Sequence, residues 1–398
     1  MQIYDHDKEE LKGLMDRVRE IASEPRNTER VKFWQPQPDT ARDHWRGTPR
    51  PRAELPRAPI TVEPEIPMWA AMLGFKVDEF YTNPATYLKY QLKMMIYRYE
   101  HWADETCIGT EVPIWLGATF ESSLLGAETI YAPDASPWLD REPVIVTEDD
   151  LDRLEYPDFR TSGLMPRAHQ YYEVLGELLD DDFKVTFPEW GRSPFGVAFH
   201  IRRYEQLALD MATNPDFTHR MMRFITDARK HWVQERAKFL DMSVEKGNLY
   251  NDEVNTPTLS PKMFEEFVLP YEQELSAFHG GILYWHSCGE TTRLAPLIAK
   301  IPNLEMFHVG PWTDPAKTVQ AFEGKMPLEF CLHPLRDVQQ ATEAEMESKL
   351  VEIAEACGPC PYTVRADGLQ VATSLQHELD QVDTWIKVAD RVLRNSQA

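Results

Sequence analysis

The sequence predicts a (β/α)8 barrel preceded by an N-terminal arm of helical and extended structure. Short apolar segments alternate with helical segments along the second half of the chain, which is typical of parallel strands buried on both faces. A helix follows each of these strands after a short loop, the pattern of right-handed βαβ units. No glycine-rich phosphate loop of the GxGxxG or GxxxxGK[ST] type follows any of them, which argues against an open nucleotide-binding sheet.

Seven segments have the length and apolar character of strands. They are residues 107–117, 183–188, 248–252, 282–286, 304–309, 327–332 and 362–366. Helices are predicted between them, including 83–101, 166–180, 197–211, 214–245, 341–356 and 375–395. Asn214-Pro215 illustrates the start signal, an N-cap residue followed by proline in the first turn.

Residues 1–60 are predicted to form an accessory arm, and residues 61–398 the barrel. A charged helix over 5–23 leads into a Pro- and Arg-rich stretch, 34–59, whose prolines oppose regular structure. The arm is compatible with covering the barrel mouth, with packing for stability, or with contacts in a homodimer. A length of 398 residues fits one large barrel with insertions.

Composition narrows the classes of partner. The net charge of −23, from 65 acidic and 42 basic residues, would repel phosphate backbones, so nucleic acid is not expected as a partner. No apolar stretch approaches the roughly 20 residues of a membrane span, and the charged N-terminus lacks the apolar segment of a signal peptide. Five scattered cysteines suit reduced thiols or metal ligands, so we expect a cytoplasmic protein.

Chemically competent side chains follow the predicted strands. In barrels of this kind the active site forms where strands end and the next loops begin. The residues at these positions are Glu189, Trp190, Asp252, Glu253, His286, Cys288, His308, Cys331, His333 and Asp367.

His286-Ser287-Cys288-Gly289 is the most distinctive of these segments. The alternation of His and Cys after an apolar strand can direct both side chains to one side, and imidazole with thiolate suits Zn²⁺. A catalytic zinc needs a third protein ligand; the candidates are Asp367, Glu253, Cys331 and the Cys357/Cys360 pair. The alternative is a half-buried cysteine beside a hydrogen-bonded histidine. The CxxC of Cys357 and Cys360 precedes a strand, which favours a structural turn at the opposite end of the barrel.

Asp252 and Glu253 are predicted as general bases, metal ligands or anchors for a cationic substrate, although Asp252 alone could cap a loop. Arg192, in the segment PEWGRSPFG, could bind a carboxylate or phosphate of the substrate, or pair with Glu189.

Aromatic side chains are expected around the same opening. Trp190, Trp285 and Trp312 could stack on an aromatic or quaternary-amine substrate. His308 and His333 are expected to contact the substrate or to orient the residues that do.

Three segments carry a resemblance to a known family. They are PFGVAFHIRRYEQLALDMATNPDFTHRMMRFITD, NDEVNTPTLSPKMFEEFVLPYEQEL and LYWHSCGETTRLAPLI. With the final strand and helix, they make residues 80–395 resemble the uroporphyrinogen decarboxylase superfamily, which also contains zinc-dependent methyltransferases that act with corrinoid proteins. The resemblance implies a (β/α)8 barrel.

The resemblance favours the methyltransferase branch. The decarboxylases carry an Arg-rich N-terminal motif, RQAGRY, that grips substrate carboxylates, and the corresponding stretch here, VKFWQPQPDTARDHW, lacks it. The methyltransferases bind zinc through His-x-Cys and a later Cys. His286 and Cys288 match the first pair, and Asp367 stands in place of the last Cys.

The implied reaction moves a methyl group from a methoxylated aromatic or a methylamine to a corrinoid protein carrying a cobalamin-type cofactor. Catalysis would involve Glu253, His286 and Asp252. A decarboxylase-like lyase and a non-catalytic tetrapyrrole-binding barrel are the alternatives.

Overall fold

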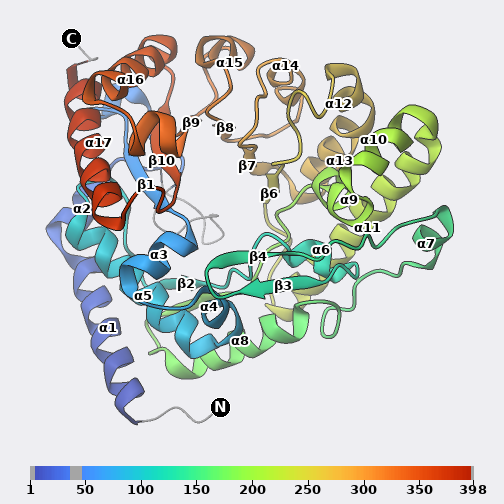
Figure 1. Ribbon diagram of the computed structural model, residues 1–398, viewed down its shortest axis with the longest axis horizontal. Helices are drawn as coiled ribbons and strands as arrows, with labels where there is room; N and C mark the ends of the chain where they lie inside the picture. The colour runs from blue at the N-terminus through green and yellow to red at the C-terminus, as the bar shows by residue number, and fades with distance from the viewer. Residues whose placement is uncertain (1–4, 36–46, 396–398) are drawn as a thin grey trace.

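The chain folds as a (β/α)8 barrel (Figure 1). The structure, a computed structural model, describes residues 5–35 and 47–395. The barrel strands are β1 (Ile60–Pro64), β2 (Glu111–Pro113), β5 (Lys184–Thr186), β6 (Gly247–Tyr250), β7 (Ile282–His286), β8 (Phe307–Val309), β9 (Leu328–Leu332) and β10 (Tyr362–Leu369).

Strand pairing closes the sheet into a ring. Six strands run parallel in the order β1-β10-β9-β8-β7-β6, so the first barrel strand pairs with the last, and β2 pairs with β5. A parallel bridge between Arg192 and Tyr250 joins the chain after β5 to β6. On the other side, the Glu105 N–H donates to the Ile60 carbonyl oxygen at 2.9 Å and joins the chain before β2 to β1. The carboxyl ends of the strands therefore meet at one mouth.

Helices surround this ring, and several begin as their sequences predict. Asn83, Ser193, Asn214, Ser260 and Asp314 each accept a backbone hydrogen bond at a helix start and are followed by proline. The main outer helices are α5 (Pro84–His101), α8 (Met165–Leu178), α11 (Pro215–Phe239), α13 (Leu269–His279), α14 (Ala295–Ile298), α15 (Pro315–Ala321), α16 (Glu343–Cys357) and α17 (Leu375–Asn395).

Shorter elements decorate the barrel loops. They are α3 (Ile66–Leu73), α4 (Val77–Thr82), α6 (Phe120–Leu124), α7 (Glu148–Arg153), α9 (Pro194–Arg202), α10 (Tyr204–Thr213), α12 (Pro261–Phe267), the turns η1 (Arg52–Glu54) and η2 (Pro334–Gln339), and the hairpin of β3 (Thr129–Ala132) and β4 (Ala135–Leu139). The helix predicted over 197–211 is two helices, because Arg203 between them has a φ of 69°.

Alternation along the strands separates an apolar layer from a polar one. Trp285 on β7 stacks on Phe307 of β8, and Phe307 packs on Phe322, which follows α15. The side chains at these alternate strand positions therefore face the surrounding helices. The other alternate positions carry ionisable side chains such as His308 and Glu329, which are neighbours in the register of β8 and β9. The lumen of the barrel is therefore the polar side.

The N-terminal arm begins with α1 (Asp5–Ser23) and α2 (Pro25–Val31). α1 lies beside α5 (Figure 1), with Glu10 Oε2 accepting from Lys89 Nζ at 2.6 Å. Of the predicted Pro-rich stretch, residues 36–46 lie outside the described residues. β1 begins at Ile60, next to the predicted domain boundary, which stays a prediction. Within the described ranges, no helix has the length and apolarity that a membrane crossing requires.

Candidate metal and substrate site

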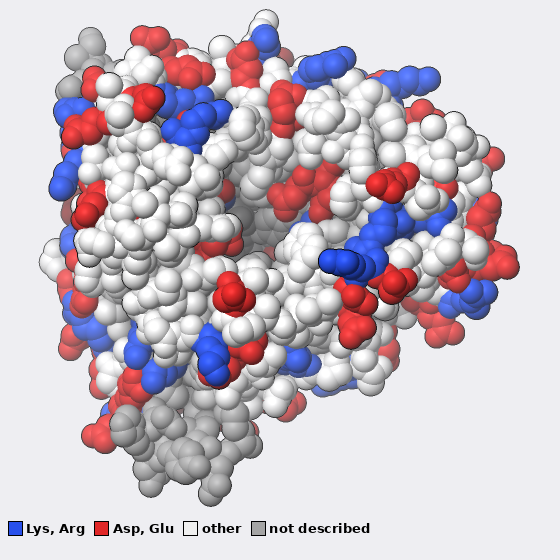
Figure 2. Space-filling view, viewed as in Figure 1, with Lys and Arg blue, Asp and Glu red and all other residues white. Residues whose placement is uncertain are grey.

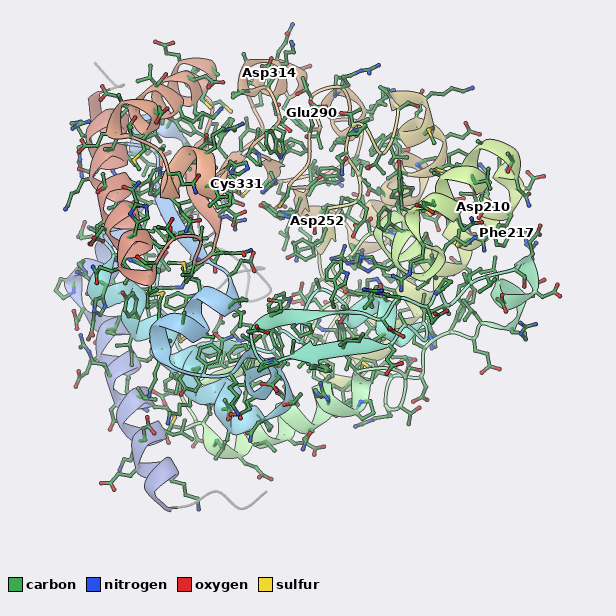
Figure 3. All side chains as sticks on the ribbon, viewed as in Figure 1. Asp210, Phe217, Asp252, Glu290, Asp314 and Cys331 are labelled. Atoms are coloured by element: carbon green, nitrogen blue, oxygen red, sulfur yellow. The ribbon has the colours of Figure 1, made fainter. Side chains whose placement is uncertain are left out.

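A hollow opens at the centre of the face seen in Figure 2, with acidic side chains around it. In Figure 3, Asp252, which follows β6, and Cys331, on β9, lie on opposite sides of this centre. The hollow is the mouth of the barrel, where the polar lumen residues meet the loops.

Three side chains able to bind a metal converge at the ends of β7 and β8. Cys288 Sγ lies 3.3 Å from His286 Nε2, and the imidazole centroids of His286 and His308 are 4.1 Å apart. One ligand atom from each residue lies within 4.8 Å of the other two. In a tetrahedral zinc site, bonds of about 2.0 Å to nitrogen and about 2.3 Å to sulfur place such atoms about 3.5 Å apart. The donor types and spacing therefore fit a zinc ion.

Cys288 is reachable from the mouth but holds its proton. Its side chain is exposed, while its depth within the barrel, followed by the charges of Asp252 and Asp367, raises the pKa of the thiol well above its usual range. A divalent cation would displace that proton. Gly310 lets β8 approach this loop, because a Cβ there would lie 2.8 Å from the Cys288 carbonyl oxygen.

Asp252 links the three ligands to a row of buried charges. Its Oδ1 lies 2.9 Å from His286 Nε2, and its side chain is 42% exposed, so a substrate can reach it. Arg192 Nη2 lies 3.8 Å from Asp252 Oδ2, and Arg192 Nη1 lies 2.5 Å from Glu253 Oε1. His200 Nε2 is 3.0 Å from the same Glu253 oxygen. The depth of Asp252 within the mouth opposes its charge, but His286 and Arg192 hold the pKa of this carboxyl below its usual range.

The predicted roles of Arg192 and Glu253 need correction. Arg192 is 5% exposed and pairs with Glu253 rather than with the predicted Glu189. Glu253 is 7% exposed, and its Oε2 faces α9, where a Cβ on Gly196 would lie only 2.6 Å away. Both residues thus lie behind Asp252 and support it.

A second group of potential ligands lies beside the first. His308, Glu329 and Cys331 also place three ligand atoms within 4.8 Å of one another, and all three residues are buried. Among the described residues, neither Asp367 nor Glu253 belongs to either group, in contrast to their predicted role as the third ligand. Asp367 Oδ1 instead lies 3.0 Å from Arg365 Nε. The geometry favours His308 as the partner of His286 and Cys288.

Glu65 is an acid at the mouth that the sequence analysis missed. It follows β1 directly, and its N–H donates to the Leu369 carbonyl oxygen at 2.9 Å. Burial, followed by the negative charges of Asp367, Glu63 and Asp252, raises the pKa of Glu65 to about 7 against the opposing effect of Arg365. Glu65 can therefore hold a proton at neutral pH.

Two of the predicted substrate-stacking tryptophans do not face the mouth. Trp190 is 3% exposed and packs against Trp232 of α11, with its indole N–H donating to the Arg192 carbonyl oxygen at 3.2 Å. Trp285 is fully buried, and its indole N–H donates to Glu272 of α13 at 2.9 Å. Both side chains belong to the core between strands and helices.

The remaining predicted aromatic and histidine positions lie at the rim. His333 caps η2 by accepting the Arg336 N–H at 3.2 Å, and its ring meets Trp312 edge-on with centroids 5.1 Å apart. Trp312 is 55% exposed. Trp312, Arg336 and Lys349 line a surface cavity of about 740 Å³. None of the residues of the two ligand groups lines this cavity.

The CxxC cysteines are not part of the site. Cys357 ends α16 and Cys360 precedes β10; both are buried, and the Cys360 thiol donates to the Met326 carbonyl oxygen at 3.1 Å. Neither cysteine joins a group of three potential ligands among the described residues. They form a turn at the amino end of β10, as their position predicts.

Sequence reasoning also passed over His200, Glu329 and Arg365. A signal existed for the last two, because a charged residue inside an apolar strand such as PLEFCL or YTVRA is rarely buried without a partner. His200 lies within a helix and carried no comparable signal.

Comparisons with known proteins agree with this architecture. The family model described as uroporphyrinogen decarboxylase (URO-D) matches residues 78–382. A search of curated proteins found no match. Among solved structures, the methyltransferase from Methanosarcina mazei aligns with a TM-score of 0.60 and 15% identity, over 85% of this chain and 94% of that chain. At this level of identity the similarity concerns the fold.

Proposed function

Because the chain belongs to the uroporphyrinogen decarboxylase (URO-D) family, we propose that it is a zinc-assisted methyltransferase. The methyl group would pass from a small methoxylated aromatic or methylamine to a corrinoid protein. The observation that carries this proposal is the convergence of His286, Cys288 and His308 at the mouth. The name of the Methanosarcina mazei protein, a methyltransferase of the same fold, supports it.

The residues at the mouth suit the chemistry of a difficult leaving group. When a methyl group departs from oxygen or nitrogen, the electron pair of the broken bond stays on that heteroatom. A bound zinc ion would supply Lewis acidity there. Glu65, whose pKa is about 7, would be the proton source at the mouth for a leaving group that departs as an anion. Asp252, whose Oδ1 lies 2.9 Å from His286 Nε2, presents a negative charge to the substrate beside the ligand group.

The arginines of the lumen argue against a polycarboxylate substrate. Arg192 and Arg365 are 5% and 2% exposed, and each already contacts carboxylates of the chain. Neither offers a free guanidinium to a substrate carboxylate. This distribution of charge supports the methyltransferase over the decarboxylase, which must grip several carboxylates.

Metal analysis and a methyl-transfer assay test the proposal together. We expect one zinc ion per chain in the wild type, and methylation of a Co(I) corrinoid when a suitable methyl donor is supplied. His286→Ala and Cys288→Ser should lose both zinc and transfer. Cys107→Ser is the matched control, because Cys107 lies outside both ligand groups, and it should keep both. Full zinc content in Cys288→Ser, or transfer by a metal-free chain, would refute the assignment.

A further inference from the structure

The barrel holds more potential metal ligands than an open site can use. His286, Cys288, His308, Glu329 and Cys331 form two groups that share His308. A catalytic zinc ion is held by three protein ligands and keeps one position for substrate, whereas four protein ligands make a closed structural site. Because the second group shares His308 with the first, an ion bound there keeps an open position only if Glu329 and Cys331 stay out of its coordination sphere.

Arg365 is placed to do this. It is on β10, paired in register with Cys331 of β9, and is 2% exposed. Its Nε lies 3.2 Å from Cys331 Sγ and 3.0 Å from Asp367 Oδ1, while Nη1 lies 3.8 Å from Glu329 Oε2. The Tyr284 hydroxyl also donates to Glu329 Oε2. The second group is thus already bound to a guanidinium and a phenol.

The charge of Arg365 is permanent. A guanidinium stays protonated in proteins, and Asp367, Cys331 and Glu329 surround this one. A fixed cation 3.2 Å from the Cys331 sulfur disfavours a divalent ion at the same sulfur. In the first group, Cys288 is exposed, and its Sγ lies 3.3 Å from His286 Nε2.

We infer that Arg365 is a positioning residue that keeps Cys331 and Glu329 out of the metal coordination sphere. Cys288 would then be the single sulfur ligand of the ion, and one position would stay available for substrate. This inference rests on the proposed metal site and goes beyond it, because it assigns the openness of that site to one guanidinium.

Cobalt substitution tests the inference without an activity assay. Co²⁺ bound by thiolate shows a sulfur-to-metal charge-transfer band whose intensity counts the sulfur ligands. In the wild type we expect the intensity of one thiolate, unchanged in Cys331→Ser and abolished in Cys288→Ser. In Arg365→Gln the intensity should double, and it should return to the wild-type value in Arg365→Gln/Cys331→Ser. Arg365→Lys keeps the charge and should keep a single-thiolate spectrum.

The outcomes separate the two proposals. A band that falls by half in Cys331→Ser would overturn the role of Arg365 while leaving a metal site in place. A chain that binds no cobalt would overturn both. If Arg365→Gln does not fold, the wild type, Cys331→Ser and Arg365→Lys still decide, because a two-thiolate spectrum in any protein that retains Cys331 and the positive charge contradicts the inference.

Discussion

Replacement of Glu272 by glutamine should stabilise the protein at pH 8 and not at pH 5. Glu272 lies on α13 with no exposed surface, and its two oxygens accept from Asn251 Nδ2 at 2.8 Å and from Trp285 Nε1 at 2.9 Å. Burial raises the pKa of this carboxyl from 4.5 to about 7, and the two hydrogen bonds and Arg229 only partly oppose the shift. The ionised form is therefore costly in the folded protein.

The sign and size follow from proton linkage. Between pH 4.5 and about 7 the folded state holds a proton that the unfolded state has lost, so stability falls as the pH rises through this window. A pKa shift of about 2.5 units corresponds to about 3 kcal/mol in the free energy of unfolding. The wild type retains this stability below pH 4.5 and has lost it above pH 7. Glutamine does not titrate, so Glu272→Gln lacks this loss.

Glutamine also replaces one of the two acceptor oxygens by an NH2 group. Asn251 can rotate its amide to offer Oδ1, which has no hydrogen-bond partner among the described residues. If one of these hydrogen bonds stays unsatisfied in the variant, its free energy of unfolding falls by about 1 kcal/mol at every pH. We therefore expect Glu272→Gln to be about 2–3 kcal/mol more stable than wild type at pH 8, and within about 1 kcal/mol of wild type at pH 5.

Urea unfolding of both proteins at several pH values between 5 and 8 measures this difference. Glu266→Gln, on the exposed side of α12, is the matched control and should show no such dependence. The reasoning is refuted if the free-energy difference between Glu272→Gln and wild type stays constant over this range, because a carboxyl with a raised pKa must then be absent.

Three further predictions concern the support of the mouth. Arg192→Met should cost about 3–5 kcal/mol, because it leaves Glu253 buried without its cation, and Arg192→Met/Glu253→Gln should recover most of that loss. Gly310→Ala should cost about 1–3 kcal/mol and weaken zinc binding, since the new methyl group meets the Cys288 carbonyl at 2.8 Å. Trp285→Phe should cost about 1–3 kcal/mol through an unsatisfied Glu272 and leave the KM for the methyl donor unchanged.

The readouts are unfolding free energies, zinc content and steady-state kinetics. Equal stability of the single and double Arg192 variants would contradict a dominant Arg192–Glu253 pair. Gly310→Ala with wild-type zinc content would show that the Cys288 loop tolerates displacement. A large rise in KM for Trp285→Phe would restore this side chain as a substrate contact.

The strand and helix pattern was predictable because it follows from local chemistry. All seven predicted strands are present, since short apolar runs between helices have few other structures available. The first strand, β1, was missed because its segment ITVEP follows a proline-rich stretch and contains a proline itself. The helix break at Arg203 was also missed, because nothing in its residue type requires a left-handed backbone.

The positions of His286 and Cys288 were predictable, but the direction of Trp285 was not. A parallel strand in a barrel is buried on both faces, so an apolar residue next to a lumen residue gives no indication of which face it occupies. Once His286 is assigned to the lumen, alternation directs Trp285 to the helices. Likewise, His308 could be joined to His286 only after the register of neighbouring strands was known.

Family membership alone does not decide between decarboxylation and methyl transfer, because one fold can carry either chemistry. The charges of the mouth discriminate better. A polyanionic substrate would have to take Arg192 from Glu253 or Arg365 from Asp367. Glu253, left buried without its cation, would cost about 3–5 kcal/mol. Asp252, 42% exposed, would repel the same substrate. A neutral or cationic methyl donor meets neither penalty, so the arrangement of buried charges favours it.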